Sequence, residues 1–256
     1  MEIKEIKTKV DGIPHMTFAQ AKAMTDIVLE NKPRHILELG FRHGVSTCYM
    51  AGALDEIGQG RITTIDLASA RGADPNVLEL LDALGLSKFV TAYFEPTSYT
   101  WRLMKMLGQA DPPQFDLCYI DGAHDWATDG FAFFLVDRLL APGGLIIFDD
   151  LDWTYAKSLA LRDSEKVRCM PEEERTLPQI RKVFELLVVT HPGYGDFMEK
   201  DGWAYARKKS MSDASVPRSV EKLVVYEQPT KAGGGLLRRL VNRLKRRPGE
   251  HGVGSR

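Results

Sequence analysis

Three acidic residues in the middle of the chain are placed to bind a hard metal ion together. Asp121 follows the apolar run 115–120, and Asp149 and Asp150 directly follow the apolar run 145–148. Such runs indicate buried parallel strands, whose carboxyl ends meet at one edge of a sheet, so the three carboxylates are expected to converge. Unpaired carboxylates would raise one another's pKa, and Mg²⁺ or Mn²⁺ removes that penalty. The alternative is that Asp150 caps a turn and Asp149 faces water.

His124 lies three residues after Asp121, at the predicted start of a helix, and is the candidate general base. Its ordinary pKa of about 6.5 lets it accept a proton near neutrality. A hydroxyl bound to a metal loses its proton more readily than a free one. The pattern therefore suits metal-assisted deprotonation of a hydroxyl, although a histidine here could also be a surface or capping residue. Trp126 and Trp153 flank the acidic motifs and could stack on a sugar ring, or could belong to the core.

A segment with two glycines, residues 38–47, suits ligand binding at the same edge. Gly40 lets the chain turn sharply out of a strand, and Gly44 lets the backbone pass close to a ligand and begin a helix. Free N–H groups at that helix start attract a carboxylate, and Glu38 is placed to meet an ammonium group. Asp66, at the tip of the next strand, stands where such folds bind a ribose. These features suit S-adenosylmethionine, while turn and cap roles are the simpler alternative.

A dinucleotide is the rival ligand for this segment. The fingerprint G-x-G-x-x-G is absent, because Arg42 takes the place of the middle glycine. This absence weakens NAD as the ligand without excluding it. A P-loop sequence is also absent, so nucleotide hydrolysis is not expected.

These residues fall at the ends of alternating strand-like and helix-like segments. Strands are predicted at residues 34–39, 61–65, 89–94, 115–120 and 145–148. Helices are predicted at residues 18–30 (capped by Thr17), 45–54, 76–84, 98–106, 125–140 (closed by residues 142–144) and 177–189. Short strands at 196–199 and 203–207, joined through Asp201 and Gly202, predict an antiparallel hairpin. The predicted fold is α/β, a doubly wound, mostly parallel seven-stranded sheet with an antiparallel C-terminal hairpin.

Three segments together resemble the class I S-adenosylmethionine-dependent methyltransferases: residues 38–47, 120–124 and 142–150. The resemblance covers roughly residues 33–155. It is greatest to the bacterial branch that includes metal-dependent sugar and macrolide O-methyltransferases, with catechol O-methyltransferase more distant. The segment 38–47 lacks the second glycine of the commonest G-x-G-x-G form, and catechol-type enzymes share that departure.

The resemblance implies a Rossmann-like methyltransferase fold and assigns roles to particular positions. It gives His124 the base role, because the Asp-x-x-His spacing occurs in the macrolide-sugar branch. It places Asp66 on the ribose hydroxyls of the cofactor. The methionine and the adenine would lie near Glu38, Gly40, Gly44 and Ser46, and near Phe94 and Glu95, respectively.

Composition limits the class of protein and its partners. The chain has 256 residues, 44% of them hydrophobic, and a net charge of −1, so nucleic acid is not expected as a partner. Three separated cysteines, no signal peptide and no bilayer-spanning run predict a cytoplasmic protein. The expected partner is a small-molecule or saccharide acceptor, and a homo-oligomer remains open. Three parts are predicted: an N-terminal helical segment 1–32, a methyltransferase domain 33–208, and a polar linker with a basic tail 209–256.

The basic tail is distinct in charge from the rest of the chain. Residues 231–256 hold eight Lys or Arg and one Glu, a charge of +7, so the other 230 residues carry −8. Apolar residues recur at helical spacing within 236–247 and predict a basic amphipathic helix. Contact with the inner membrane surface or docking to a partner is one interpretation, and a disordered or self-packed tail is the other.

Two rival functions remain from the sequence. One is a metal-independent small-molecule methyltransferase, with Asp149 and Asp150 serving the acceptor directly. The other is a non-catalytic scaffold that keeps the methyltransferase fold.

Overall fold

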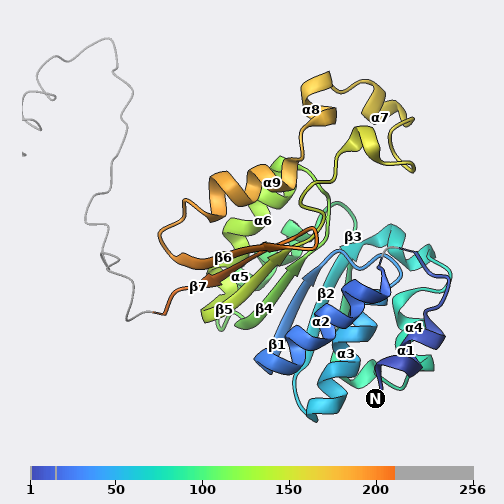
Figure 1. Ribbon diagram of the computed structural model, residues 1–256. Coiled ribbons are helices and arrows are strands. Elements are labelled where there is room, and N and C mark those ends of the chain that lie inside the picture. Colours follow the sequence, from blue (N-terminus) through green and yellow to red (C-terminus); the bar gives the residue numbers. More distant parts are fainter. Residues whose placement is uncertain (1, 15, 211–256) are drawn as a thin grey trace, which may run out of the picture. The chain divides into compact units, whose positions relative to one another are not determined.

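The computed structural model describes residues 2–14 and 16–210, and its centre is a seven-stranded sheet of order β3-β2-β1-β4-β5-β7-β6 (Figure 1). The first five strands pair in parallel, whereas β7 is antiparallel to both β5 and β6. The predicted sheet with its antiparallel C-terminal hairpin is therefore confirmed. The strands are β1 (His35–Leu39), β2 (Arg61–Leu67), β3 (Val90–Glu95), β4 (Phe115–Ile120), β5 (Leu140–Phe148), β6 (Tyr194–Lys200) and β7 (Trp203–Lys208).

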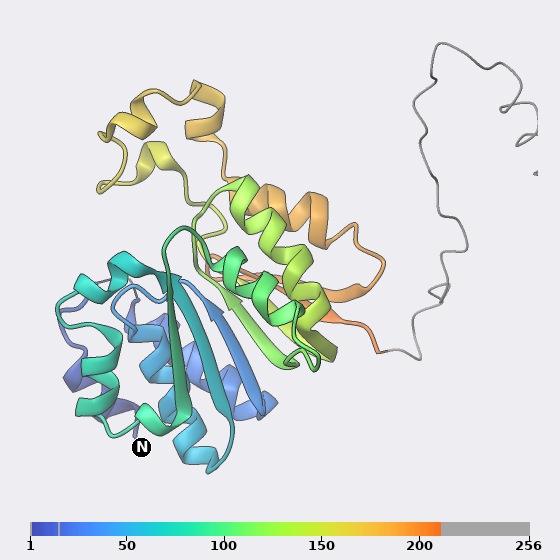
Figure 2. The same cartoon turned by 180° about the vertical axis from the view of Figure 1, so that it is seen from behind.

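Helices cover both faces of this sheet (Figures 1 and 2). One face carries α1 (Ile3–Lys9), α2 (Phe18–Asn31), α3 (Val45–Ile57) and α4 (Val77–Ala83). The other carries α5 (Tyr99–Leu107), α6 (Trp126–Leu139) and α9 (Gln179–Val183), which continues as the π-helical turn Phe184–Val188. Five short helices complete the described chain: Ala68–Gly72, Ser87–Phe89, Tyr155–Lys157, α7 (Glu165–Arg168) and α8 (Glu172–Thr176).

Alternation along the central strands divides the apolar core into two layers. Ile36 and Tyr119 face the α3 side of the sheet, while Leu37 and Cys118 face the α6 side. Because both faces are covered, all five residues of β1 are buried. The N-terminal segment belongs to the same core, since Ile6 of α1 is 1% exposed and lies against Gly52 of α3.

Three of the helices that the sequence predicted, α2, α4 and α6, begin with a side-chain cap. Thr17 and Gln20 form a capping box at α2, and Asn76 and Glu79 form another at α4. Asp125 caps α6 through its bond to the Thr128 N–H.

Several predicted boundaries differ from the structure, and three of them concern β5, β2 and the last predicted helix. Strand β5 begins at Leu140, so residues 142–144 lie within the strand instead of closing a helix. An irregular register between β4 and β5 accommodates them, since the pairing shifts between Phe115 and Leu117. Strand β2 continues through Asp66 to Leu67. The predicted helix 177–189 is shorter and ends in the π-helical turn.

In the part of the chain that the structure describes, we find no helix long and apolar enough to span a bilayer. The amphipathic segment predicted at 236–247 lies outside the described residues, as does almost all of 209–256, so its membrane contact stays a prediction.

We expect alanine substitutions at the two ends of α3 to differ in their effect on the free energy of unfolding. Gly44 and Gly58 both have left-handed backbones, with φ of 92° and 80°. A Cβ at Gly44 would lie 2.4 Å from Cγ2 of Val77, whereas one at Gly58 meets nothing within 4 Å. Gly58→Ala should cost about 1 kcal/mol from backbone strain. Gly44→Ala should cost about 2–4 kcal/mol, because overpacking adds about 1–3 kcal/mol.

Equilibrium unfolding in urea measures both variants. Adding Val77→Ala to Gly44→Ala should cost less than the sum of the two single changes, because it removes the Cγ2 methyl group that would overlap most with the new Cβ. Equal losses for Gly44→Ala and Gly58→Ala would show that the overlap with Val77 has no effect.

Candidate functional site

A cavity of about 580 Å³ opens at the carboxyl edge of the sheet. The segment after β1, the tips of β2, β4 and β5, and the N-terminal segment before and within α2 all contribute to its wall. Its wall includes seven of the predicted site residues: Gly40, Ser46, Asp66, Asp121, His124, Asp149 and Asp150. The structure thus brings the predicted cofactor segment and the predicted metal residues to one cavity.

Gly40 has a structural reason to be glycine. Its φ is 86°, and a Cβ there would lie 1.9 Å from the carbonyl oxygen of Asp121. The segment after β1 therefore passes directly against the tip of β4. The chain then enters α3, whose first turn contributes Val45 and Ser46 to the cavity wall, so the free N–H end of that helix faces the cavity.

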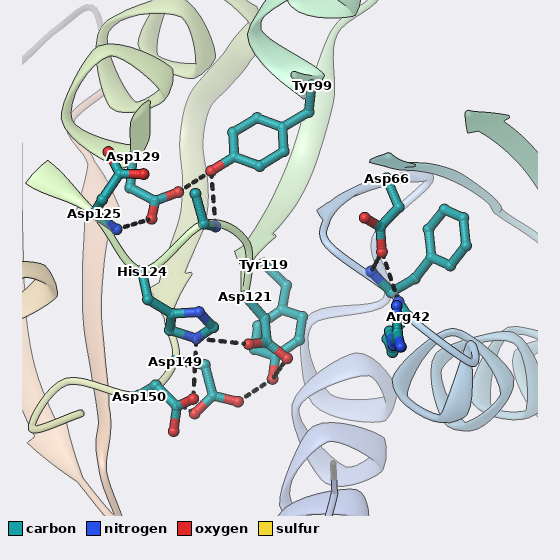
Figure 3. A network of polar contacts seen from close by, with 12 residues as sticks. Arg42, Asp66, Tyr99, Tyr119, Asp121, His124, Asp125, Asp129, Asp149 and Asp150 are labelled. Carbon is teal, nitrogen blue, oxygen red and sulfur yellow. Dashed lines mark hydrogen bonds and ion pairs between the residues drawn. The ribbon is translucent and has the colours of Figure 1, made fainter. Parts of the chain in front are cut away.

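Asp66 lies on the cavity wall, as the sequence predicts, and its carboxylate binds the backbone beside Gly40. Oδ2 accepts the N–H groups of Phe41 and Arg42 at 2.9 and 2.7 Å (Figure 3). Arg42 has a left-handed φ of 47° that these bonds hold in place. Asp66 therefore shapes the segment 38–47, and its contact with a ribose stays a prediction.

Glu38 does not lie where the sequence suggested. Its side chain is 0% exposed and accepts hydrogen bonds from the hydroxyls of Ser46, Thr47 and Thr64. Burial raises the pKa of Glu38 to about 7 against the opposing effect of these hydrogen bonds. The carboxyl group holds the start of α3 from beneath, and Ser46, which it binds, is the residue that reaches the cavity. A direct contact between Glu38 and an ammonium group disagrees with this geometry.

Phe94 and Glu95, predicted near the adenine, do not belong to the cavity wall either. The guanidinium of Arg71 covers the Phe94 ring, 4.0 Å from its centroid. Glu95 is 2% exposed and forms ion pairs with Arg102 and Lys105. Arg71, Arg102 and Lys105 lie outside β3, and the sequence of the strand itself does not indicate that they contact it. An adenine could stack on Phe94 only after Arg71 has moved away.

The tips of β4 and β5 are neighbours, as predicted, and they bring an acidic cluster together. Nε2 of His124 lies 3.4 Å from Oδ1 of Asp121 and 3.0 Å from Oδ2 of Asp150 (Figure 3). One donor atom from each of these three residues falls within 4.8 Å of the others. The remaining carboxylate, Asp149, accepts the Tyr119 hydroxyl and the Asp150 N–H instead.

The structure therefore brings together donor atoms of Asp121, His124 and Asp150 instead of the three predicted carboxylates, and metal binding stays a prediction. The Tyr119 hydroxyl donates to Asp149 and also lies 3.5 Å from Oδ2 of Asp121, so Asp149 already has a partner beneath the cluster. Burial raises the pKa of Asp149 to about 7, with the charges of Asp121 and Asp150 adding to the effect.

His124 is more basic in this arrangement than a free imidazole. Burial lowers its pKa, but the two neighbouring carboxylates raise it by more, to about 10. Neither carboxylate oxygen has the angle of a hydrogen bond to the buried Nε2, which therefore lacks a hydrogen-bond partner. When no cation balances the charge of the two carboxylates, the imidazole is protonated at neutral pH. A protonated imidazole cannot accept a proton, which opposes the predicted role of His124 as general base.

The donors fit a divalent cation. Neighbouring ligands at right angles around a cation with bonds of about 2.1–2.4 Å lie about 3.0–3.4 Å apart. This matches the 3.4 and 3.0 Å that separate Nε2 of His124 from the oxygens of Asp121 and Asp150. Two carboxylates suit a hard cation, and an imidazole nitrogen without a hydrogen-bond partner is available as a third ligand. Mg²⁺ or Mn²⁺ is therefore compatible with the residues present.

The predicted aromatic contacts and the N-terminal wall complete the site. The ring of Trp153 lies 4.9 Å from that of His124, and Trp126 is 42% exposed, but neither belongs to the cavity wall. Stacking of either ring on an acceptor stays a prediction. Sequence reasoning missed the part of the wall that the N-terminal segment contributes, which is Pro14, Met16, Thr17 and Gln20. Thr17 was recognisable as a helix cap, but only the packing of α2 places it opposite the acidic cluster.

Comparison with known proteins identifies the central part of the chain. Residues 37–151 match the family model described as a methyltransferase domain. None of the curated proteins compared with the chain matches its sequence. The matched part runs from within β1 to just past β5 and includes Asp121, His124 and Asp150.

Solved structures share the fold at low sequence identity. The O-methyltransferase TomG from Streptomyces achromogenes, involved in tomaymycin synthesis and solved with S-adenosylmethionine, has 18% identity over 82% of this chain and 92% of its own, with a TM-score of 0.60. An O-methyltransferase from Bacillus cereus in complex with S-adenosylhomocysteine has 20% identity over the same shares, also with a TM-score of 0.60. The S-adenosylhomocysteine-bound methyltransferase PaMTH1 from Podospora anserina has 18% identity over 81% and 87%, with a TM-score of 0.56.

We expect the buried Glu38 to make stability depend on pH. Its pKa of about 7 in the folded protein exceeds the ordinary value of 4.5, so the stability it contributes is present below pH 4.5 and is lost as the pH rises to 7. Glu38→Gln removes this dependence, because the amide does not ionise and the three hydroxyls can rotate to suit it. Relative to the variant, the wild type should lose at most about 3 kcal/mol between pH 4.5 and 8.

Urea unfolding at both pH values measures this difference. Glu173→Gln, a change at an exposed glutamate of α8, is the control and should leave the pH dependence as in the wild type. Identical pH profiles for the wild type and Glu38→Gln would mean that the buried carboxyl group is not the cause.

Proposed function

We propose that this methyltransferase domain is a divalent-metal-dependent O-methyltransferase that uses S-adenosylmethionine to methylate a hydroxyl of a sugar or related small molecule. One observation carries the proposal. A single cavity has the N–H end of α3 and Asp66 on one side, and Asp121, His124 and Asp150 on the other. The first group suits the cofactor, and the second suits a cation that binds the acceptor.

The cofactor half is supported by charge and by geometry. The exposed N–H end of α3 attracts the methionine carboxylate. Asp66 stands at the tip of β2, beside the segment 38–47, where a ribose binds in folds of this topology. TomG and the Bacillus cereus enzyme, which share this fold, were solved with S-adenosylmethionine and with S-adenosylhomocysteine, respectively.

The chemical half explains how a hydroxyl becomes reactive. Asp121, Asp150 and His124 would hold the cation, which supplies Lewis acidity that lowers the pKa of the acceptor hydroxyl. His124 would take the proton only where Asp121 and Asp150 hold the cation without it and its imidazole is neutral, because a ligated or protonated imidazole cannot accept a proton. The acceptor oxygen then forms a bond to the sulfonium methyl group, and S-adenosylhomocysteine leaves with the electron pair of the broken carbon–sulfur bond.

The size of the cavity supports a small acceptor. Small-molecule sites measure about 300–1,000 Å³, and this one measures about 580 Å³. Its wall carries several hydroxyl, carboxylate and amide groups, which suits a polyhydroxylated ligand better than an apolar one. Thr17 and Gln20 of the N-terminal segment add a hydroxyl and an amide group to this wall.

Asp149 favours a second candidate, a metal-independent methyltransferase. Its carboxyl group is on the cavity wall, and burial raises its pKa to about 7, which suits a general base near neutrality. In this alternative Asp149 takes the proton of the acceptor hydroxyl directly. Removal of metal separates the two candidates, because only the first loses activity.

We expect Asp66→Ala to weaken binding of S-adenosylhomocysteine, measured by calorimetry. Loss of a charge-assisted hydrogen-bond pair costs roughly 1.5–3 kcal/mol, which is about a 10- to 150-fold rise in Kd. Asp66→Asn keeps one acceptor oxygen for the Phe41 and Arg42 amides and should weaken binding less. Asp163→Ala, at an exposed site in the segment between β5 and α9, is the control. Tight binding of NAD with no binding of S-adenosylhomocysteine would refute the proposed cofactor.

We expect EDTA to abolish methyl transfer, and Mg²⁺ or Mn²⁺ to restore it. Calorimetry with Mn²⁺ should show that Asp121→Asn and Asp150→Asn each weaken metal binding by at least about tenfold, the effect expected when a ligand is lost. Asp149→Asn is the matched control, because Tyr119 already occupies that carboxylate, and it should change Mn²⁺ affinity little.

Full turnover in EDTA would rule out the metal and leave Asp149 as the base. Equal Mn²⁺ affinities for Asp149→Asn and Asp121→Asn would refute the proposal that Asp121, His124 and Asp150 are the ligands. His124→Ala separates the two roles of the imidazole. A ligand role predicts weaker Mn²⁺ binding, whereas a base role predicts unchanged binding with turnover lowered about 10²- to 10⁴-fold.

A further inference from the structure

Two buried polar residues lie behind the chain segment that carries His124. Tyr99 begins α5 and Asp129 lies in the first turn of α6, and their side chains are 4% and 0% exposed. The Tyr99 hydroxyl donates to Oδ1 of Asp129 (Figure 3). Neither residue belongs to the cavity wall, so a contact with cofactor or acceptor does not explain why a phenol and a carboxylate are buried there.

This Tyr99–Asp129 pair holds the backbone on both sides of His124. The N–H of Ala123 donates to the Tyr99 hydroxyl, and the N–H of Asp125 donates to Oδ2 of Asp129, each at 3.2 Å. His124, between these two peptides, has a left-handed φ of 57°. Residues other than glycine rarely adopt that conformation, and it persists only where the surroundings fix it. The hydrogen bonds of the Ala123 and Asp125 N–H groups fix the backbone of His124 in this conformation.

Packing reinforces the same segment. A Cβ at Gly122 would lie 2.6 Å from both the ring and the hydroxyl of Tyr99, so the backbone at Gly122 rests directly on the phenol. Asp125 then caps α6 through the N–H of Thr128. Every peptide from Gly122 to Asp125 is therefore positioned relative to Tyr99 or to the start of α6.

We propose that Tyr99 and Asp129 are positioning residues, which fix the left-handed turn at His124 and so hold its imidazole against Asp121 and Asp150. The consequence for catalysis rests on the proposed function, because it assumes that this cluster binds the cation and the acceptor. An apolar pair of the same shape would leave the partly buried Ala123 and Asp125 N–H groups without these partners. Those peptides would then rotate toward other acceptors, and the imidazole would move with them.

Amide hydrogen exchange tests the positioning without metal, cofactor or acceptor. In Tyr99→Phe, the amide of Ala123 loses its acceptor and should exchange about five- to tenfold faster, the factor expected from the loss of one neutral hydrogen bond, while the amide of Asp125 keeps Asp129 as its acceptor. Tyr194→Phe is the matched control, because it removes another buried phenol hydroxyl, 2% exposed on β6. In that variant the two amides should exchange as in the wild type. Unchanged exchange in Tyr99→Phe, or equal changes in both variants, would overturn the proposal.

Kinetics and metal binding test the consequence. Tyr99→Phe should lower kcat about tenfold and weaken Mn²⁺ binding, while KM for S-adenosylmethionine stays unchanged because the cofactor half of the cavity is untouched. Faster exchange with normal kcat and normal Mn²⁺ affinity would reduce the pair to a structural role and overturn the proposal. A wild type without methyl transfer would refute the proposed function alone, since exchange and Mn²⁺ binding still report on the pair.

A double variant separates a pair from two independent residues. In Asp129→Asn, the amide places a donor against either the Tyr99 hydroxyl or the Asp125 N–H, so its effect should exceed that of Tyr99→Phe. Tyr99→Phe with Asp129→Asn should cost about as much as Asp129→Asn alone, because the two act through one hydrogen-bonded unit. If the effects of the two single variants add up in the double variant, the proposal that Tyr99 and Asp129 act as a pair is overturned. If Asp129→Asn does not fold, exchange and Mn²⁺ binding in Tyr99→Phe decide the question.

Discussion

The close contact between the segment after β1 and the tip of β4 is the constraint on which the site depends. Strands β1 and β4 are neighbours in the sheet, but their following helices, α3 and α6, cover opposite faces. The chain therefore diverges at this point and leaves a crevice, as open α/β sheets do where the strand order reverses. Gly40 lets the two tips touch, because any Cβ there would overlap the Asp121 carbonyl group. A wider separation would part the cofactor segment from the acidic cluster and divide one cavity into two.

Hydrogen bonding then decides which acidic residues remain available for chemistry. Glu38 is surrounded by three hydroxyls beneath α3, and Asp149 is bound by Tyr119 and by the Asp150 N–H. These buried carboxyl groups have satisfied acceptors, so they stabilise the local structure. Asp121 and Asp150 face Nε2 of His124 instead, at 3.4 and 3.0 Å, and this cluster is where we propose that a cation binds. Acidic residues that lie close together thus have different roles, some structural and some proposed to be chemical. The hydrogen-bond partners of each carboxyl group distinguish the two roles.

This distinction also marks how far the sequence could predict the structure. Periodicity gave the β-α alternation and the antiparallel hairpin, because each depends on residues close together in the chain. The convergence of Asp121 with Asp149 and Asp150 followed from strand order alone. The role of Glu38, the loss of Asp149 from the metal set and the cover of Phe94 by Arg71 depend on partners that are distant in sequence or lie on an opposite face. A single sequence carries no signal for such pairings, and the boundary of β5 failed for a related reason, since a register irregularity absorbed residues 142–144.

Backbone strain lies where the chemistry is proposed. His124 and Asp150, two of the three candidate ligands, both have left-handed backbones, with φ of 57° and 54°. Each such residue costs of order 1–3 kcal/mol, which the surrounding structure must offset. The Tyr99–Asp129 pair does so for His124, and the Asp149 carboxylate, which accepts the Asp150 N–H, does so for Asp150. Tyr99, Asp129 and Asp149 thus have a common structural effect. They hold two strained turns at the ends of β4 and β5, and these turns direct the imidazole and the carboxylate toward one another.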